Sequence, residues 1–332
     1  MRLAVLSDTH GNLPALEAVL ADMRQQGVDG IIVAGDFTTG GPQQLETINL
    51  LRSLGSWMIR GNRENYLLAY DTGDAPDGRR VSKQWATMRW SYHRLDRETL
   101  DFIAVLPEQR VVALDDAAPI RVVHGSLRSP SELLFPDRDP VTLGLFRKAG
   151  LLLPGHDPVK LYQALAQVKE PVLVCGHSHI PWKQEQNGRL VLNPGSVGAP
   201  INGDVRAQYA LLTWQDGHWQ AEHRAIAYDL ERIRAAFSES GLLEEGGALA
   251  RAWLLVIETG QNVSGRLVSY AYGLAAEAGC EGSDVVPDSI WEHAIATFDW
   301  ETVASKSILT GLWTKPRWRP ETRFLMPNCR PG

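Results

Sequence analysis

The sequence has few cysteines and no long apolar run. Among its 332 residues, Cys175, Cys280 and Cys329 are far apart and form no CxxC pair. We therefore expect no disulfide framework, which fits a reducing compartment. No apolar stretch approaches the about 18 residues that a membrane helix needs. Only the short apolar run 3–6 precedes the first polar residues, which is too short for a signal peptide. These features predict a cytoplasmic protein without a membrane segment.

The sequence also lacks an excess of positive charge. Its formal net charge at pH 7 is −6, which argues against a general nucleic-acid-binding surface. The composition is otherwise ordinary, with 44% hydrophobic and 22% charged residues. That is enough material for one large domain, or for one domain with an appendage.

The first sixty residues alternate between strand-like and helix-like patterns. A short apolar run at 3–6 is followed by apolar residues at helical spacing over 13–23, and Gly27 ends that segment. A second helix is expected after Pro42. Strands that alternate with helices pair in parallel.

The residues after the first sixty predict strands that pair in a mixed or antiparallel way. A hairpin is expected across Asp216-Gly217, a pair typical of two-residue turns. Residues 64–106 look mostly helical, apart from a surface loop at 71–78, and 126–170 holds two helices that would wall a cleft. Strands are expected at 111–114, 120–123, 190–192, 207–214 and 217–226. Two sheets with helices outside would accommodate both halves.

The pattern becomes helical after residue 226. We expect a domain over 1–226 and a helical C-terminal extension over 227–332, with helices at 229–238, 246–258, 264–278 and 288–304. The last 27 residues hold six basic residues and one acidic residue. Three interpretations of this basic tail stay open: it docks on its own body or on a sister subunit, it holds an anionic substrate, or it contacts nucleic acid.

Polar residues of metal-binding types follow five of the apolar runs. In chain order they are Asp8-Thr9-His10, Gly35-Asp36, Gly61-Asn62, His124-Gly125 and Gly176-His177-Ser178-His179. Each fragment alone is also typical of a turn or of a core histidine. Together they favour one polar site at the carboxyl edge of a sheet, where open α/β folds place their sites.

The spacing and number of these residues favour two ions. On an extended backbone Asp8 and His10 point to the same face, and so do His177 and His179. Asp36 offers a carboxylate that can bridge two cations. The potential ligands in these fragments are two carboxylates, one amide and four imidazoles. These seven groups are too many for one tetrahedral ion and suit two ions about 3.5–4 Å apart. Nitrogen and oxygen ligands without thiolate favour Mn, Fe or Zn, and Co or Ni are also compatible.

The five fragments resemble the motifs of the calcineurin-like metallophosphoesterase superfamily, D-x-H, G-D-x-x-x-x-G, G-N-H-[DE], H-G and G-H-x-H. The run 7–16 is close to its small bacterial and archaeal phosphodiesterase-like branch. The resemblance covers residues 1 to about 225. It implies a four-layer α-β-β-α sandwich within the α/β (α+β) class. It also implies that Asp8, His10 and His179 hold one metal, that Asn62, His124 and His177 hold the other, and that Asp36 bridges them.

The resemblance implies hydrolysis of a phosphate ester, with a phosphodiester favoured. A hydroxide shared by the two metals would attack phosphorus in line. The substrate would be a phosphorylated small molecule or a nucleotide, and the extension could form a homo-oligomer. Two alternatives stay open: a protein or dinucleoside-polyphosphate phosphatase, and a non-catalytic scaffold on the same fold.

Arg63 departs from the family pattern, which has histidine at this position. Arginine keeps its proton, so it cannot act as a general acid, but its planar fork can bind a phosphoryl oxygen. We predict that Arg63 binds substrate in this way and that diesters, aryl phosphates or anhydrides are favoured over alkyl monoesters. The alternative is a structural pair with Glu64 or Asp71. His156, in the expected cleft wall, is a further candidate substrate contact, and the Gly-rich turn 193–198 either shapes the site or is only a turn.

Overall fold

The computed structural model describes residues 1–136, 140–152, 158–280 and 284–305. The strands are β1 (Arg2–Leu6), β2 (Gly30–Val33), β3 (Trp57–Met58), β4 (Gln109–Val112), β5 (Ile120–Val123), β6 (Leu134–Phe135), β7 (Val159–Lys160), β8 (Val172–Val174), β9 (Pro181–Gln186), β10 (Arg189–Pro194), β11 (Ala207–Gln215) and β12 (His218–Ile226). The helices of the first 226 residues are α1 (Leu13–Gln26), α2 (Gln44–Ser53), α3 (Asn62–Thr72), α4 (Asp77–Val81), α5 (Ala86–Tyr92), α6 (Arg97–Val105), α7 (Pro140–Lys148) and α8 (Leu161–Leu165), with a 3₁₀ turn at Lys83–Trp85. The later helices are α9 (Leu230–Glu239), α10 (Leu242–Glu245), α11 (Gly247–Thr259), α12 (Val263–Glu277), α13 (Asp288–Thr297) and α14 (Trp300–Ser305).

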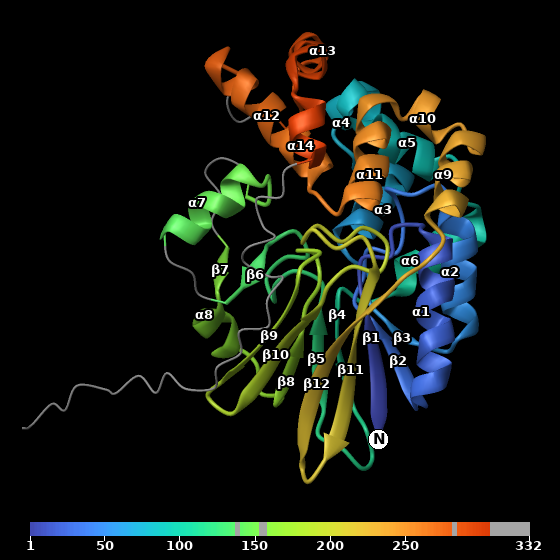
Figure 1. The fold of residues 1–332 in the computed structure, drawn as a ribbon, viewed down its shortest axis with the longest axis vertical. Helices are drawn as coiled ribbons and strands as arrows, with labels where there is room; N and C mark the ends of the chain where they lie inside the picture. Colours follow the sequence, from blue (N-terminus) through green and yellow to red (C-terminus); the bar gives the residue numbers. More distant parts are fainter. Residues whose placement is uncertain (137–139, 153–157, 281–283, 306–332) are drawn as a thin grey trace, which may run out of the picture.

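Two mixed five-stranded sheets pack face to face between helices (Figure 1). Their strand orders are β12-β11-β1-β2-β3 and β4-β5-β8-β10-β9, and β6 pairs with β7 beside them. The predicted fold class, two mixed sheets flanked by helices with a helical C-terminal part, is confirmed.

Alternating side chains of β1 show how the layers hold together. Leu3 and Val5 point between the sheets and share a core with Val174. Ala4 and Leu6 point the other way, into a core with α1. This alternation follows from the two-residue period of a strand. Each large side chain buried in this way stabilises the fold by about 1.5–3 kcal/mol.

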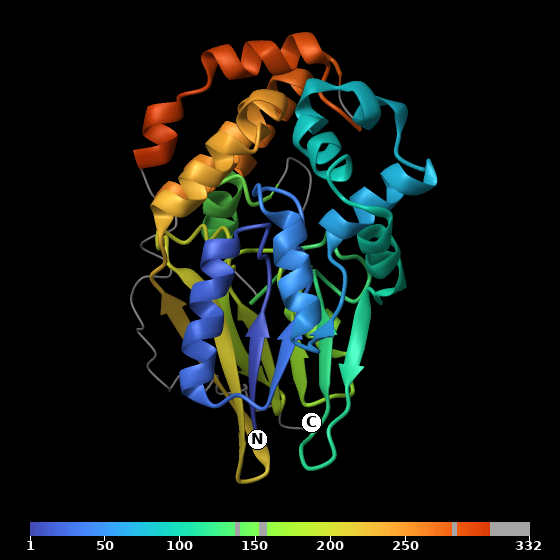
Figure 2. The same cartoon turned by 90° about the vertical axis from the view of Figure 1, so that its right-hand side faces the viewer.

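Parallel pairing brings the ends of several strands to one edge. β1 pairs in parallel with β2, and β2 with β3. In the other sheet β8 pairs in parallel with both β5 and β10. Figures 1 and 2 show the orange and red C-terminal helices at the end of the molecule opposite the N-terminus, the end toward which β1 runs.

Two hairpin turns have similar backbone geometry, and only one of them was predicted. Asp216 and Gly217, with φ of 52° and 78°, form the predicted two-residue hairpin turn between β11 and β12. Asn187 and Gly188 have φ of 53° and 72° and join β9 to β10 in the same way. Strand β9 was not predicted, although Asn-Gly is a strong hairpin signal.

Three predicted boundaries were wrong. The expected surface loop at 71–78 is shorter, because α3 runs to Thr72 and α4 begins at Asp77. The strand expected at 111–114 is β4, which ends at Val112. The single helix expected at 288–304 is two helices, because Phe298 is extended and Asp299 accepts a hydrogen bond from the Thr302 backbone at 3.0 Å. An aspartate in this position caps a new helix.

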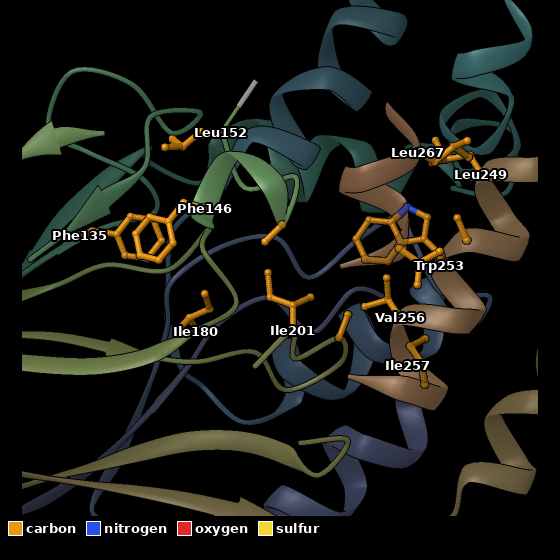
Figure 3. Close-up of a cluster of buried hydrophobic side chains, with 14 of the residues drawn as sticks. Phe135, Phe146, Leu152, Ile180, Ile201, Leu249, Trp253, Val256, Ile257 and Leu267 are labelled. Carbon is orange, nitrogen blue, oxygen red and sulfur yellow. The ribbon is translucent and has the colours of Figure 1, made fainter. Parts of the chain in front are cut away.

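The C-terminal helices share one core with the second sheet. Trp253, Val256 and Ile257 of α11 belong to the same buried cluster as Phe135 and Phe146 (Figure 3). The predicted division at residue 226 stays a prediction, and the basic tail lies outside the described residues. Among the helices described, none is long and apolar enough to cross a membrane.

Candidate metal centre

Two groups of side chains converge where the predicted site residues follow their strands. Asp8, His10 and His179 form one group, and Asp36, His124 and His177 form the other. Within each group one potential ligand atom per residue lies within 4.8 Å of the others. The six residues come from loops after β1, β2, β5 and β8, so both sheets contribute.

The two groups adjoin through their carboxylates. Oδ2 of Asp36 lies 3.3 Å from Nε2 of His124 in its own group and 4.0 Å from Nε2 of His10 in the other. Oδ1 of Asp8 lies 3.3 Å from Nε2 of His179 and 3.9 Å from Nε2 of His124. The seventh predicted residue, Asn62, places Oδ1 3.2 Å from Nε2 of His124.

Backbone carbonyl groups orient all four imidazoles. Nδ1 of His10 donates to Thr39 at 3.0 Å, Nδ1 of His124 to Ala34 at 2.7 Å, Nδ1 of His179 to Ala199 at 2.6 Å and Nε2 of His177 to Ser131 at 3.1 Å. A carbonyl can only accept, so each of these nitrogens carries a proton. In a neutral ring the other nitrogen then carries a lone pair, which is the usual arrangement of metal-ligating histidines.

Two further features of this site fit a bound cation. Nε2 of His10 and Nε2 of His179 are 3.0 Å apart, and two lone pairs this close repel each other unless a positive charge lies beside them. Oδ1 of Asp8 is buried and has no hydrogen-bond partner among the residues that the structure describes. A buried carboxylate oxygen without a donor is costly, so the donor set fits metal ions.

The electrostatics of the site favour ionised carboxylates. Burial alone would raise the pKa of Asp8, but His179 and His124 outweigh it and lower the pKa to about 2. Asp36 is also buried, yet His124, His10 and Arg63 hold its pKa well below the usual range. Conversely, Asp36 and Asp8 overcome the burial of His124 and raise its pKa to about 10. The carboxylates therefore favour positive charge at Nε2 of His124, whether a proton or a metal ion supplies it.

A match to the sequence model of a protein family shows to which family the chain belongs. The model of the calcineurin-like phosphoesterase superfamily domain matches residues 1–217. The chain belongs to this superfamily. Membership supports the predicted hydrolysis of phosphate esters and the predicted dependence on metal.

Individual proteins that are similar to this chain share 24–28% of its residues over the matched regions. The protein MJ0912 of Methanocaldococcus jannaschii is 28% identical over 250 residues, which cover 69% of this chain and 89% of that protein. The phosphodiesterase YfcE of Escherichia coli K12 is 25% identical over 212 residues, covering 64% of this chain and 87% of YfcE. A metallophosphoesterase from Sphaerobacter thermophilus has the same fold, with a TM-score of 0.57 and 24% identity over 78% of this chain and 99% of that one.

The backbone conformation at the superfamily motifs differs from our prediction. Asp8, His10, Asp36, His177 and His179 all have positive φ, between 49° and 64°. The prediction that extended backbone aligns residues two apart was therefore wrong, although these side chains do converge. Aspartate and histidine tolerate this left-handed conformation better than most residues, and such strain concentrates at functional sites.

Glu64 is a residue of the site that sequence analysis missed. It is fully buried and accepts hydrogen bonds from the backbone of Asp36 at 2.8 Å, of Gly61 at 2.7 Å and of Thr38 at 3.0 Å. It thereby joins the loops after β2 and β3. Its burial and the charge of Asp36 raise the pKa of Glu64 to about 7. The acidic last position of the G-N-H-[DE] motif was the signal that could have identified it.

The turn at 193–198 contacts two loops of the site. Oγ of Ser196 donates to the carbonyl of Asp8 at 2.7 Å. Nδ2 of Asn193 donates to the carbonyl of Gly176 at 2.6 Å. Of the two interpretations left open for this segment, the one in which it shapes the site is favoured.

Arg63 lies at the edge of the site and is 29% exposed. Its backbone N–H donates to Oδ1 of Asp36 at 2.9 Å, and its Nε lies 4.0 Å from Oδ2 of the same residue. The alternative of a pair with Glu64 or Asp71 was wrong, because Glu64 binds the backbone and Asp71 pairs with Arg97. His156 lies outside the described residues.

Proposed function

We propose that the protein hydrolyses phosphate esters at a centre of two divalent metal ions and favours phosphodiesters. The observation that carries this proposal is the pair of adjoining three-residue groups with the carboxylate of Asp36 directed at both. A single ion would not require two such groups.

Each residue has a defined part in this proposal. Asp8, His10 and His179 would hold one ion, Asn62, His124 and His177 would hold the other, and Asp36 would bind both. Bound ions would supply an ionised water for in-line attack on phosphorus and would neutralise the phosphoryl oxygens. Mn, Fe or Zn fit a donor set of imidazole, carboxylate and amide.

Arg63 would determine which esters react. An arginine guanidinium can bind a phosphoryl oxygen through two N–H groups. It cannot give a proton to a departing alkoxide. Esters with good leaving groups, such as diesters, aryl phosphates and anhydrides, should therefore react faster than alkyl monoesters.

A substrate panel tests the proposal. The metal-free protein is loaded with Mn²⁺ or Zn²⁺ and assayed on an alkyl monoester, its matched diester, an aryl phosphate and a dinucleoside polyphosphate. Arg63→Ala should lower kcat/KM about 10- to 100-fold on the diester, as loss of a charged, bidentate contact does. Arg97→Ala, which changes an exposed arginine of α6, serves as the matched control.

Arg63→His restores the residue of the superfamily motif. We expect it to raise the rate on the alkyl monoester relative to the diester, because imidazole can donate a proton. Equal rates of the unaltered protein on the alkyl monoester and its matched diester would refute the role of Arg63. No metal-dependent hydrolysis of any ester would refute the proposed activity and leave the scaffold alternative.

A further inference from the structure

Trp253 reaches the metal centre from outside the residues that the superfamily model matches. It belongs to α11, beyond the match at residues 1–217, and is 4% exposed. Its ring centroid lies 4.8 Å from that of His10 and 6.2 Å from that of His179. A helix of the C-terminal region therefore forms one wall of the site.

The same indole contacts Arg63. Cζ of Arg63 lies 5.4 Å from the centroid of the Trp253 ring, which is within the range of a cation–π interaction. Nε of Arg63 also lies 4.0 Å from Oδ2 of Asp36. The guanidinium of Arg63 thus lies between the face of the Trp253 ring and the carboxylate of Asp36. That carboxylate also lies near His10 of one ligand group and His124 of the other.

The position of Trp253 is fixed by its own packing. The ring shares a buried cluster with Val256 of its own helix and with Ala199 and Ile201 of the loop after β10 (Figure 3 labels Trp253, Val256 and Ile201). A Cβ atom on Gly40 would lie 3.1 Å from the ring, so the indole also lies against the loop after β2. A well-packed ring of this kind can restrain a long, flexible arginine.

We propose that Trp253 is a positioning residue that holds the guanidinium of Arg63 over the metal centre, so that the C-terminal helices take part in binding the phosphoryl group. The inference rests on the proposed function. Without the indole, the Arg63 side chain would sample more rotamers, and phosphate would lose part of a charged contact. Binding of phosphate and KM should then change more than kcat.

A double-mutant cycle in the full-length, metal-loaded protein tests the inference. Trp253→Leu, Arg63→Ala and the double variant are compared for the Kd of inorganic phosphate by calorimetry and for kcat and KM on an aryl diester. Trp253→Leu should raise the phosphate Kd and the KM about tenfold, the size of a partly desolvated cation–π contact. In the Arg63→Ala background the same change should be less than about twofold, because interacting residues are not additive.

Two further variants separate positioning from folding. Trp253→Phe keeps an aromatic face and should restore phosphate binding to within about threefold of the unaltered protein. Trp291→Leu, in α13 of the same buried core, should lower the thermal midpoint without changing the phosphate Kd. If Trp253→Leu does not fold, Trp253→Phe in both Arg63 backgrounds supplies the cycle, with a two- to threefold effect expected only when Arg63 is present.

Equal effects of Trp253→Leu with and without Arg63 would overturn the inference, and so would an equal shift of the phosphate Kd in Trp291→Leu. Failure of the proposed function would give a different experimental result from failure of this inference. In that case the unaltered protein itself would bind no metal and hydrolyse no ester.

Discussion

Gly198 lies where the turn after β10 meets the loop that carries Asp8. Its N–H donates to the carbonyl of Asp8 at 3.0 Å, and an added Cβ would lie 1.9 Å from the carbonyl oxygen of Thr9. Gly198→Ala must therefore displace the Asp8 loop. We expect metal affinity to fall about 10- to 100-fold, as it does when residues that orient ligands are changed. Calorimetric titration with Mn²⁺ measures it.

The control for this change is Gly273→Ala in α12. Apart from the neighbouring residues of the helix itself, the part of the chain that the structure describes places no atom within 4 Å of a Cβ added there, and alanine is the better helix former. This variant should keep its metal affinity, and its thermal midpoint should rise slightly. Unchanged metal affinity in Gly198→Ala would contradict the role given to the turn.

The residue types of the site could be predicted, but their supports could not. Asp8, His10 and Asp36 were identified because each follows an apolar run, and parallel strands bring such positions together. Their left-handed backbone was not predicted, because it depends on hydrogen bonds between loops distant in sequence. Glu64 and Trp253 were missed for the same reason, since only the folded chain brings their partners to them.

Helix α1 is tied to the edge of the first sheet by Asp22. Its carboxylate accepts hydrogen bonds from Nε and Nη2 of Arg224 on β12 at 2.7 Å and 2.9 Å, and from the hydroxyl of Tyr209 on β11 at 2.5 Å. The hydrogen bond from Arg224 is the main cause that lowers the pKa of Asp22 below its usual value. The folded state therefore favours the ionised carboxylate.

A pH series tests this tie. Asp22→Asn should lower the free energy of unfolding by about 1–3 kcal/mol at pH 7, the range for hydrogen bonds to charged groups. Because the folded pKa is depressed, the contribution is full above the unfolded pKa of about 3.9 and is lost as pH falls through the folded pKa. Urea titrations from pH 7 to pH 3 should show the difference between variant and unaltered protein shrinking only below about pH 4. A difference independent of pH would contradict the assignment, and Asp101→Asn on the exposed face of α6 is the control.

Elements with strong local signals were predicted, and elements that depend on tertiary packing were not. Helix α1 has its signals in the sequence, because Asn12 caps it and Gly27 ends it with a φ of 60°. The short pair β6–β7 lacks such signals, since each strand has only two residues and gains its stability from the surrounding core. The break between α13 and α14 lay hidden in a pattern that stays apolar at helical spacing across Phe298.

The C-terminal helices and the second sheet behave as one packing unit. Trp253 and Trp291 share a buried cluster with Phe146, Leu173 and Trp182. We expect a chain ending at residue 226 to expose this apolar surface and to aggregate or unfold. Circular dichroism, limited proteolysis and metal titration of the truncated chain measure this. A folded, metal-binding fragment would show instead that the predicted domain over 1–226 is independent.

Metal stoichiometry tests the central claim most directly. The unaltered protein, freed of metal and then titrated with Mn²⁺ or Zn²⁺, should bind two ions per chain. Asp36→Asn should bind fewer than two ions at the same concentration and lose at least about 100-fold in kcat, because Asp36 adjoins both groups. Asp101→Asn should bind two. A stoichiometry of one or none in the unaltered protein, or two ions and full activity in Asp36→Asn, would contradict the two-metal account.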